Sequence, residues 1–312
     1  MHHEIQIKNK VKYHYLSENI RLTGNKWKKL RVYIGKGGLS KRELNSLISR
    51  NKKILVAKVN EARKLYDPLF SILTEDQISK LEKIKHEYQK SKQKIPKSVW
   101  ENYYESFITE FTYDTNAIEG SSVTLQETAL ILFDKIVPEG KTITEIREVE
   151  NHKEAFDVML NYSGDIIKRF VLQLHKKLMH NILWEYAGRF RDVQVAIRGA
   201  DFLPPPPEKV ESEFKTLMKW YGVNKNKYHP IVVATYFHAA FESVHPFRDG
   251  NGRTGRLLLN FILHKKRFPM INIKNKDKIK YYNSLEEAQK SGNIKPLVDL
   301  IVKYVTESEI WI

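Results

Sequence analysis

The sequence contains no cysteine in its 312 residues. This absence excludes a disulfide scaffold, a thiolate nucleophile and any zinc or iron–sulfur site built on cysteine. The sequence also lacks long apolar runs. The first ten residues are polar and charged, unlike a secretory signal, and the apolar run at 257–263 is interrupted by Asn260 and too short to span a bilayer. We therefore expect a cytoplasmic protein with no membrane partner.

Hydrophobic residues make up 41% of the chain and aromatic residues 11%. This composition is enough to bury a sizeable core, so it excludes a wholly disordered chain. At roughly 100–200 residues per domain, the length favours about two domains.

The positive charge is concentrated at the beginning of the chain. The net charge is +16, and residues 1–100 hold 24 Lys and Arg against 9 Asp and Glu, whereas residues 101–312 hold 29 against 28. One interpretation is an N-terminal module that binds an acidic protein surface or nucleic acid. The other is a lysine-rich surface that adds solubility, which we favour slightly because no interleaved aromatic pattern stands out.

The first hundred residues predict a small α+β module. Two strand-like runs within 11–35 flank Thr23-Gly24-Asn25, which predicts a β-hairpin. Helical periodicity begins after Ser40, with Glu43 completing a capping box, and a second helix follows Thr74. We place the domain boundary at Pro96, which gives a basic N-terminal module over 1–96 and a second domain over 97–312.

The second domain is predicted to be mainly α. Apolar residues recur with the helical period in nine segments: 97–113, 124–137, 144–162, 165–185, 207–222, 229–243, 254–266, 277–291 and 294–308. The exception is 190–199, which alternates like a strand and predicts a small β-hairpin or flap.

Twelve residues, 245–256, carry the chemistry. They read HPFRDGNGRTGR and predict a loop followed by the N-terminus of a helix. Gly250 and Gly252 allow a ligand to approach the backbone closely, and the free N–H groups of the helix favour an anion. Arg253 and Arg256 suit phosphate, Asp249 suits Mg²⁺, and His245 can act as a general base. The alternative is an ordinary helix–loop–helix turn with a capping aspartate and surface arginines.

This segment resembles the signature of the Fic family, HxFx[DE]GNGRxxR, at every position. The resemblance covers roughly residues 97–308 and implies a Fic-type helical bundle that transfers AMP from ATP to a hydroxyl side chain of a target protein. It implies that His245 deprotonates the hydroxyl, that Asp249 holds Mg²⁺, and that ATP phosphates are bound by Gly250, Asn251, Gly252, Arg253, Thr254, Gly255 and Arg256. The Doc-like phosphotransferase branch usually has lysine in place of Gly252, so this position favours nucleotidyl transfer.

A second stretch, 115–120, is similar to the family's inhibitory motif [ST]xxxE[GN]. The resemblance implies an inhibitory helix around 105–120 in which Thr115, Glu119 and Gly120 form the motif. Glu119 would pair with Arg256 and occupy the place of the γ-phosphate. The alternative is a helix surface that ends at Gly120.

Two further segments are assigned by resemblance. The predicted flap, with Ile197, Arg198, Gly199 and Ala200, would dock an extended target segment by strand addition, and residues 187–191 also resemble the family. Tyr281, Tyr282 and Gln289 are candidates for the adenine side. Five histidines lack metal-ligand spacing and are expected to be ordinary residues: His175, His180, His229, His238 and His264.

Two other functions stay open. The same residues would serve removal of AMP from a modified target, with Glu119 aligning a water molecule. The charge of the N-terminal module would instead suit a DNA-binding regulator with a secondary Fic core. The oligomeric state is also open, with a homodimer as one candidate.

Overall fold

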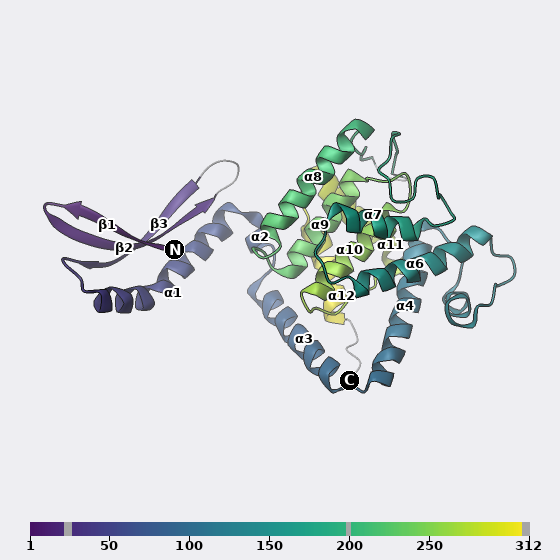
Figure 1. The fold of residues 1–312 in the computed structure, drawn as a ribbon, viewed down its shortest axis with the longest axis horizontal. Helices are drawn as coiled ribbons and strands as arrows, with labels where there is room; N and C mark the ends of the chain where they lie inside the picture. Colours follow the sequence, from purple (N-terminus) through teal and green to yellow (C-terminus); the bar gives the residue numbers. More distant parts are fainter. Residues whose placement is uncertain (22–26, 198–200, 308–312) are drawn as a thin grey trace. The chain divides into compact units, whose positions relative to one another are not determined.

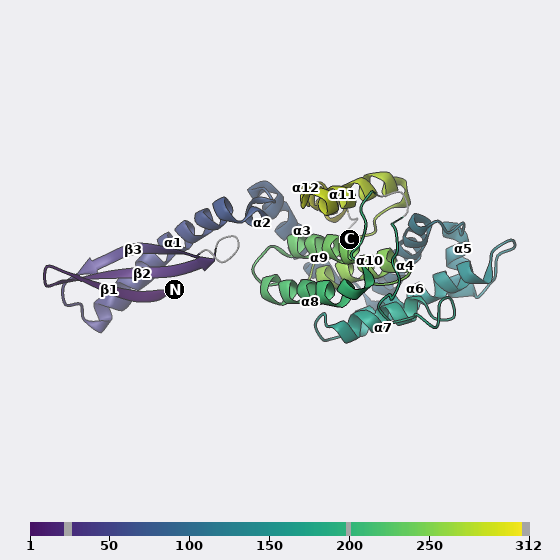
Figure 2. The same cartoon turned by 90° about the horizontal axis from the view of Figure 1, so that it is seen from above.

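The chain divides into two compact units, Met1–Thr74 and Glu75–Ile312. A computed structural model describes residues 1–21, 27–197 and 201–307. Figure 1 and Figure 2 show the two units from perpendicular directions. Among the described residues, no helix is both long and apolar enough to cross a membrane.

The N-terminal unit is built on an antiparallel sheet with the strand order β1-β2-β3. Its strands are β1 (His2–Lys8), β2 (Val11–Arg21) and β3 (Trp27–Lys36). The predicted hairpin is confirmed as β2 and β3, although residues 22–26 between them lie outside the described residues. The sequence did not predict β1. Its signal was Ile5 and Ile7 alternating with polar residues before Asn9 and Lys10, whose φ values of 48° and 63° suit a two-residue hairpin turn.

Helix α1 (Lys41–Tyr66) covers one face of this sheet. Its N-terminus has the capping box predicted from Ser40 and Glu43. Apolar side chains from β2, β3 and α1 form the core of the unit: Leu16, Ile20, Val32, Ile34, Leu55, Val59 and Ala62. The short helix α2 (Pro68–Ser71) follows, with Asp67 as its N-cap. Among the described residues of this unit, α1 is the helix that packs on the sheet, and it covers one face.

The second unit is helical, which confirms the predicted mainly α class. Its elements are α3 (Glu75–Lys94), α4 (Lys97–Glu119), α5 (Leu125–Ala129), the π-helical turn η1 (Leu130–Asp134), α6 (Ile143–Asn161), α7 (Lys168–Leu178), α8 (Pro207–Asn224), α9 (Pro230–Val244), α10 (Asn251–Lys265), the 3₁₀ turn η2 (Asn275–Asp277), α11 (Lys278–Ser291) and α12 (Lys295–Glu307). Most residues of α9 and α10 are buried, so these two helices form the centre of the unit.

Helix α3 belongs to the helical unit, whereas the sequence assigned it to the N-terminal module. It buries Leu81 and Tyr88, and the Gln89 side-chain amide donates to the carbonyl of Arg267 at 2.8 Å. The division therefore falls after Thr74, earlier than the boundary expected at Pro96. Pro96 separates α3 from α4, but both helices belong to the same unit. A proline interrupts a helix within a domain as readily as between two domains.

The strand predicted over 190–199 differs in the structure. Residues 190–197 and 201–206 form no strand, and Arg198, Gly199 and Ala200 lie outside the described residues. The buried guanidinium of Arg191 donates to the carbonyl oxygens of His245, Val193 and Pro205, so a side chain satisfies backbone groups that a partner strand would otherwise pair. The prolines at 204–207 then prevent a regular ladder.

Candidate active site

The loop between α9 and α10 is held in one conformation by its own residues. His245 ends α9 in the left-handed region, with φ 47° and its N–H bonded to the Phe241 carbonyl at 2.9 Å. This conformation is uncommon for a residue other than glycine. Gly250 has φ 75°. The Asn251 side chain accepts from the Phe247 N–H at 2.8 Å and donates to the Phe247 carbonyl at 2.9 Å, which clamps the turn.

His175 on α7 supports this loop from behind. Its ring stacks on Phe247 with centroids 3.6 Å apart. The Gly188 N–H donates to Nδ1 at 2.9 Å, so the ring proton is on Nε2, which donates to the carbonyl of Asp249 at 3.0 Å. Burial lowers the pKa of His175 to about 4, so the ring is neutral. The sequence analysis treated His175 as an ordinary histidine and did not predict its contact with the loop.

The ring of His245 carries its hydrogen on one nitrogen and can accept a proton on the other. Its Nδ1 lies 3.3 Å from the carbonyl oxygen of Glu242. A carbonyl oxygen only accepts, so Nδ1 carries the hydrogen and Nε2 keeps its lone pair. Burial lowers the pKa of His245 to about 4, which keeps the ring neutral at physiological pH. Its carbonyl accepts from Arg191 Nε at 2.8 Å, which fixes the backbone on which the ring stands.

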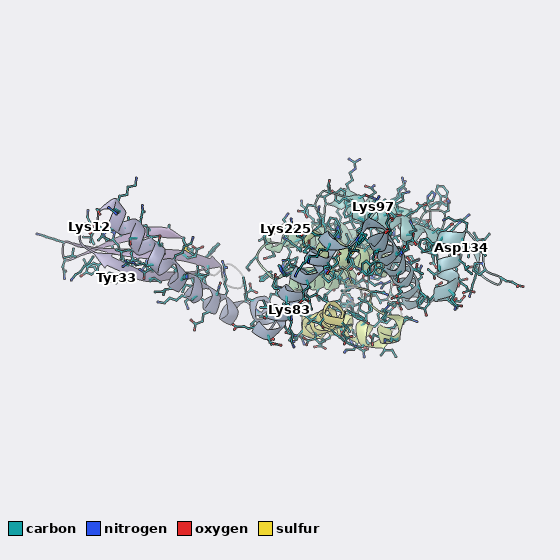
Figure 3. All side chains as sticks on the ribbon, turned by 90° about the horizontal axis from the view of Figure 1, so that it is seen from below. Lys12, Tyr33, Lys83, Lys97, Asp134 and Lys225 are labelled. Atoms are coloured by element: carbon teal, nitrogen blue, oxygen red, sulfur yellow. The ribbon has the colours of Figure 1, made fainter. Side chains whose placement is uncertain are left out.

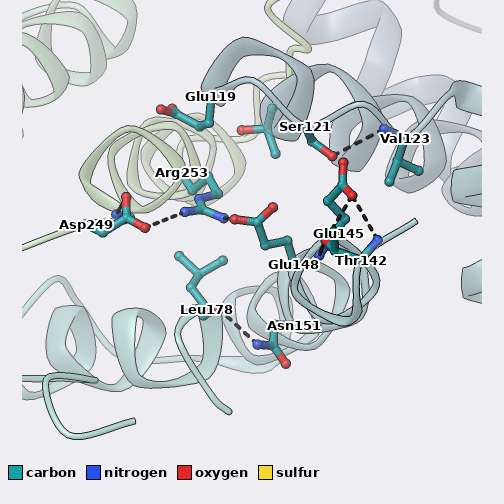
Figure 4. A network of polar contacts seen from close by, with 12 residues as sticks. Glu119, Ser121, Val123, Thr142, Glu145, Glu148, Asn151, Leu178, Asp249 and Arg253 are labelled. Carbon is teal, nitrogen blue, oxygen red and sulfur yellow. Dashed lines mark hydrogen bonds and ion pairs between the residues drawn. The ribbon is translucent and has the colours of Figure 1, made fainter. Parts of the chain in front are cut away.

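Asp249 is held at the entrance of α10 by two donors, of which Figure 4 shows Arg253. Its carboxylate accepts from the Gly250 N–H at 2.6 Å and from the Arg253 guanidinium at 3.2 Å. Arg253 in turn donates to Glu148 on α6 at 2.7 Å. Burial alone would lower the pKa of Arg253, but the carboxylates of Glu148 and Asp249 outweigh it and raise that pKa. The side chain of Asp249 is still 52% exposed, which leaves it accessible to a cation.

Arg256 is buried and bonded to the end of α4. Its Nε donates to the Thr115 hydroxyl at 2.7 Å, and its terminal nitrogen donates to the Thr115 carbonyl at 3.1 Å and to the Glu119 carboxylate at 2.6 Å. Burial alone would lower the pKa of Arg256, but the Glu119 carboxylate raises it, so the guanidinium stays charged. Helix α4 ends one residue later at Gly120, which has φ 109°.

The end of α4 is fixed by a second helix. Both the N–H and the hydroxyl of Ser122 donate to the Glu145 carboxylate, at 2.9 and 2.7 Å. Glu145 also accepts from Thr142 at the first turn of α6, and these bonds lower the pKa of Glu145 to about 2 (Figure 4). The chain after Glu119 is therefore anchored rather than free to swing.

The Glu119 carboxylate lies directly over the first turn of α10. A Cβ placed on Gly252 would lie 2.3 Å from Glu119 Oε1 and 2.9 Å from the Arg256 guanidinium. Only glycine at this position permits that approach. The carboxylate thus occupies the space where α10 offers its free N–H groups and Arg256 its charge, which is where an anion would bind.

A cavity of about 260 Å³ opens at this place. Among its lining residues are many predicted from the sequence: Glu119, Ile197, His245, Asp249, Gly250, Asn251, Gly252, Arg256, Tyr281, Tyr282 and Gln289. Arg253, Thr254, Gly255, Thr115 and Gly120 do not line it. Tyr281 is fully buried, with its hydroxyl 2.7 Å from His238 Nε2, whereas Tyr282 is 37% exposed.

Sequence reasoning missed Glu242, which also lines the cavity. Its side chain is buried, and Oε1 has no hydrogen-bond partner. Burial raises the pKa of Glu242 to about 8. The Arg256 charge opposes this shift and the Glu119 charge adds to it, so the carboxyl is mostly protonated at neutral pH. No signal marked it, because a single glutamate on an apolar helix is not a motif. Within the described residues, no group of three or more acidic or histidine side chains could hold a metal.

The geometry agrees with comparisons to known proteins. Residues 165–263 match the model described as the Fic/DOC family, so the chain contains a Fic/DOC-family domain. The chain is 34% identical over 196 residues to "Protein adenylyltransferase Fic" of Nematostella vectensis, covering 61% of this chain and 45% of that protein. It is 33% identical over 200 residues to "Protein adenylyltransferase fic-1" of Caenorhabditis elegans, covering 62% and 39%.

A solved structure supports the fold over a longer stretch. The structure of Fic-1 residues 134–508 from C. elegans is 27% identical and has a TM-score of 0.66, covering 80% of this chain and 74% of that one. The chain spans less than half the length of the two curated relatives.

Proposed function

We propose that this protein is an autoinhibited protein adenylyltransferase, which transfers AMP from ATP to a hydroxyl side chain of a target protein. One observation carries the proposal: a neutral histidine, an accessible carboxylate, a helix N-terminus and a buried arginine face one cavity. The names of the curated relatives support the same activity.

His245 is the proposed general base. The target hydroxyl oxygen attacks the α-phosphorus of ATP while its proton passes to His245 Nε2, and the bond to pyrophosphate breaks as the new P–O bond forms. The hydrogen bond from Nδ1 to the Glu242 carbonyl orients the ring. That carbonyl also stabilises the imidazolium that forms during the transfer.

The first turn of α10 is the proposed phosphate site. The backbone at Gly250, Asn251 and Gly252 presents N–H groups to the negative charge that develops during transfer. Arg256 would bind the γ-phosphate, since its guanidinium is buried and permanently charged. Arg253 acts indirectly in this scheme, because it holds Asp249 and does not line the cavity.

Asp249 is the proposed ligand of Mg²⁺. The donor set fits this ion, because Mg²⁺ in nucleotide sites is bound by one or two carboxylates together with substrate phosphates. The exposed carboxylate of Asp249 lies beside the phosphate site. Bound Mg²⁺ would neutralise phosphate charge, and the hydrogen bonds from Gly250 and Arg253 keep the carboxylate turned toward that position.

Two other parts of the cavity wall complete the scheme. Tyr282 and Gln289 on α11 would contact the adenine side, and the buried Tyr281 would support them. Ala196 and Ile197 of the predicted flap also line the cavity, so we assign target docking to this flap. The cytoplasmic location and the homodimer stay predictions of the sequence.

Autoinhibition follows from the position of Glu119. Its carboxylate neutralises Arg256 and lies over Gly252, so the γ-phosphate would meet both an occupied guanidinium and a like charge. Charge-assisted hydrogen bonds to a buried guanidinium are strong, which makes Glu119 an effective competitor. The wild-type protein should therefore transfer AMP slowly.

Radiolabelled ATP and intact mass spectrometry test this proposal. Glu119→Gly should raise AMP incorporation by tenfold or more, because removing the carboxylate frees Arg256. Glu139→Gly, which removes an exposed glutamate before α6, is the matched control and should match wild type. The double variant Glu119→Gly/His245→Ala should be silent, since removal of a general base costs about 10²–10⁴-fold.

The outcomes separate the two claims. If Glu119→Gly is no more active than wild type while both transfer AMP, the autoinhibition claim fails and the transferase claim stands. If the target gains the mass of one phosphate instead of AMP, the claim of adenylyl transfer is overturned.

A further inference from the structure

The open face of the N-terminal sheet is not used by the AMP-transfer site. Side chains of directly paired residues share a face, and Leu16 pairs with Val32 on the side that α1 covers. Tyr15 pairs with Tyr33 and Ser17 with Arg31, which places these residues on the other side. Within the described part of its own unit, no helix covers this face.

Aromatic and basic side chains alternate on the outward side of β3. Residues 27, 29, 31 and 33 are two apart, so Trp27, Lys29, Arg31 and Tyr33 point to the same side. Trp27 is 64% exposed and Tyr33 is 50% exposed. The full sequence hides this pattern, because the inward residues Leu30 and Val32 lie between them. The interleaved aromatic pattern that the sequence analysis did not find is therefore present on one face.

Tyr33 forms a cluster of rings with two tyrosines of the neighbouring strand, Tyr13 and Tyr15. The rings of Tyr15 and Tyr33 have centroids 5.7 Å apart, and those of Tyr13 and Tyr33 are 6.4 Å apart. Figure 3 labels Tyr33 on β3 and Lys12 on β2 within this unit. Tyrosine faces exposed on a sheet are suited to stack against flat rings of a ligand.

An acidic residue, Glu4, lies on the same face and forms ion pairs with Lys29 and Arg31. Glu4 on β1, opposite Tyr15, contacts Lys29 Nζ at 2.7 Å and an Arg31 terminal nitrogen at 2.9 Å. The hydrogen bond from Lys29 lowers the pKa of Glu4 to about 2, so it stays charged. Two cations against one anion leave this face positive, and the whole unit, residues 1–74, holds 17 Lys and Arg against 5 Asp and Glu, a net +12.

We propose that this face, formed by Tyr13, Tyr15, Trp27, Lys29, Arg31 and Tyr33, binds single-stranded nucleic acid. Basic side chains attract the phosphates, and the aromatic rings stack with unpaired bases. A duplex keeps the faces of its bases stacked inside, so it cannot use the rings in this way. An anionic membrane would leave the polar side chains of Gln6 and Asn19 on this face against lipid. The proposal does not depend on AMP transfer.

Fluorescence anisotropy of the full-length protein with a fluorescein-labelled oligothymidylate of about 20 nucleotides tests the proposal. Tyr33→Ala and Trp27→Ala should each weaken binding by roughly 5- to 100-fold, which is the range for loss of one stacked base. Tyr33→Phe and Trp27→Phe keep the ring and should bind within about twofold of wild type. Trp184→Ala removes a 73% exposed tryptophan of the helical unit and is the matched control.

Competing ligands decide between the alternatives. A duplex of the same length and phosphatidylserine vesicles should both compete less well than the oligothymidylate. Equal competition by the duplex, tighter binding to the vesicles, or binding that the alanine variants leave unchanged would each overturn the proposal. His245→Ala should bind the oligonucleotide like wild type, so failure of AMP transfer and failure of this proposal are seen separately.

Discussion

At the scale of single residues, burial sets the charge of each group in the cavity. It lowers the pKa of His245 to about 4 and raises the pKa of Glu242 to about 8, so two adjacent groups of α9 and its loop are mostly neutral at pH 7. Arg256 is as deeply buried but stays charged because Glu119 contacts it. In this cavity the buried cation Arg256, already paired with Glu119, therefore lies beside a neutral histidine.

Glu242 predicts a pH dependence of stability. Its folded pKa of about 8 lies above the unfolded value of 4.5, so between these values the folded state binds the extra proton and stability falls as pH rises. The buried histidines act in the opposite direction, but only below about pH 6.5. Between pH 6.5 and 8, Glu242→Gln should be less sensitive to pH than wild type, by up to ~1.4 kcal/mol per unit.

Urea unfolding at several pH values across this interval measures the effect. Glu185→Gln, a change at an exposed glutamate of the same unit, should keep the wild-type slope. Equal slopes for wild type and Glu242→Gln would mean that Glu242 is ionised in the folded protein at pH 7.

The sequence predicted the residues of the loop because they are contiguous and fold together. His175, Glu148 and Glu242 could not be found in the same way. Each comes from a separate helix and gains its role only through packing, His175 through the Asp249 carbonyl and Glu148 through Arg253. A sequence motif detects residues that are close along the chain, whereas these contacts join residues that are far apart in the sequence.

At the scale of elements, periodicity predicted the helices of the second unit well, because their apolar faces are buried against one another. It was wrong at 190–197, where alternation also fits a loop without strands, in which the Arg191 side chain bonds the carbonyls of Val193 and Pro205. It missed β1, since half of that strand's residues are exposed on a small sheet and the turn at Asn9 lacks glycine. Strands at the edge of a small sheet give weak patterns for this reason.

The close packing of α10 on α9 predicts a second stability effect. A Cβ on Gly255 would lie 2.3 Å from Glu242 Oε1 and 2.9 Å from His238 Nδ1. Both neighbours are buried, so Gly255→Ala should destabilise the helical unit by about 1–3 kcal/mol through overpacking.

Gly222 is the matched control for this change. It lies inside α8, and a Cβ there would meet nothing within 4 Å. Gly222→Ala should therefore stabilise the protein by about 0.5–1 kcal/mol, since alanine favours a helix. Denaturant unfolding of both variants measures the contrast. If Gly255→Ala is also stabilising, α9 and α10 are less tightly packed than the structure indicates.

At the scale of the whole molecule, two separate cores explain why the boundary was hard to predict. The sequence showed where the net charge falls and where a proline interrupts the helical pattern. A folded unit is instead defined by the side chains that are buried together. Leu55 and Val59 pack with the sheet, whereas Leu81 and Tyr88 of α3 are buried in the helical unit. Helices α1 and α3 are both rich in lysine, so composition alone assigns both to the same basic module.

Two cores predict that unfolding is not a single two-state event. Scanning calorimetry should show two transitions, with enthalpies of about 50 kcal/mol for residues 1–74 and about 160 kcal/mol for the helical unit. Because the proposed nucleotide site lies in the helical unit, a non-hydrolysable ATP analogue with Mg²⁺ should raise only the larger transition. At about 100 times its Kd, the ligand adds ~2.7 kcal/mol. Glu119→Gly should show the larger shift at equal ligand concentration, since Arg256 then has no carboxylate partner. A single transition that the nucleotide moves as a whole would contradict independent units, and a nucleotide shift confined to the smaller transition would place the site elsewhere.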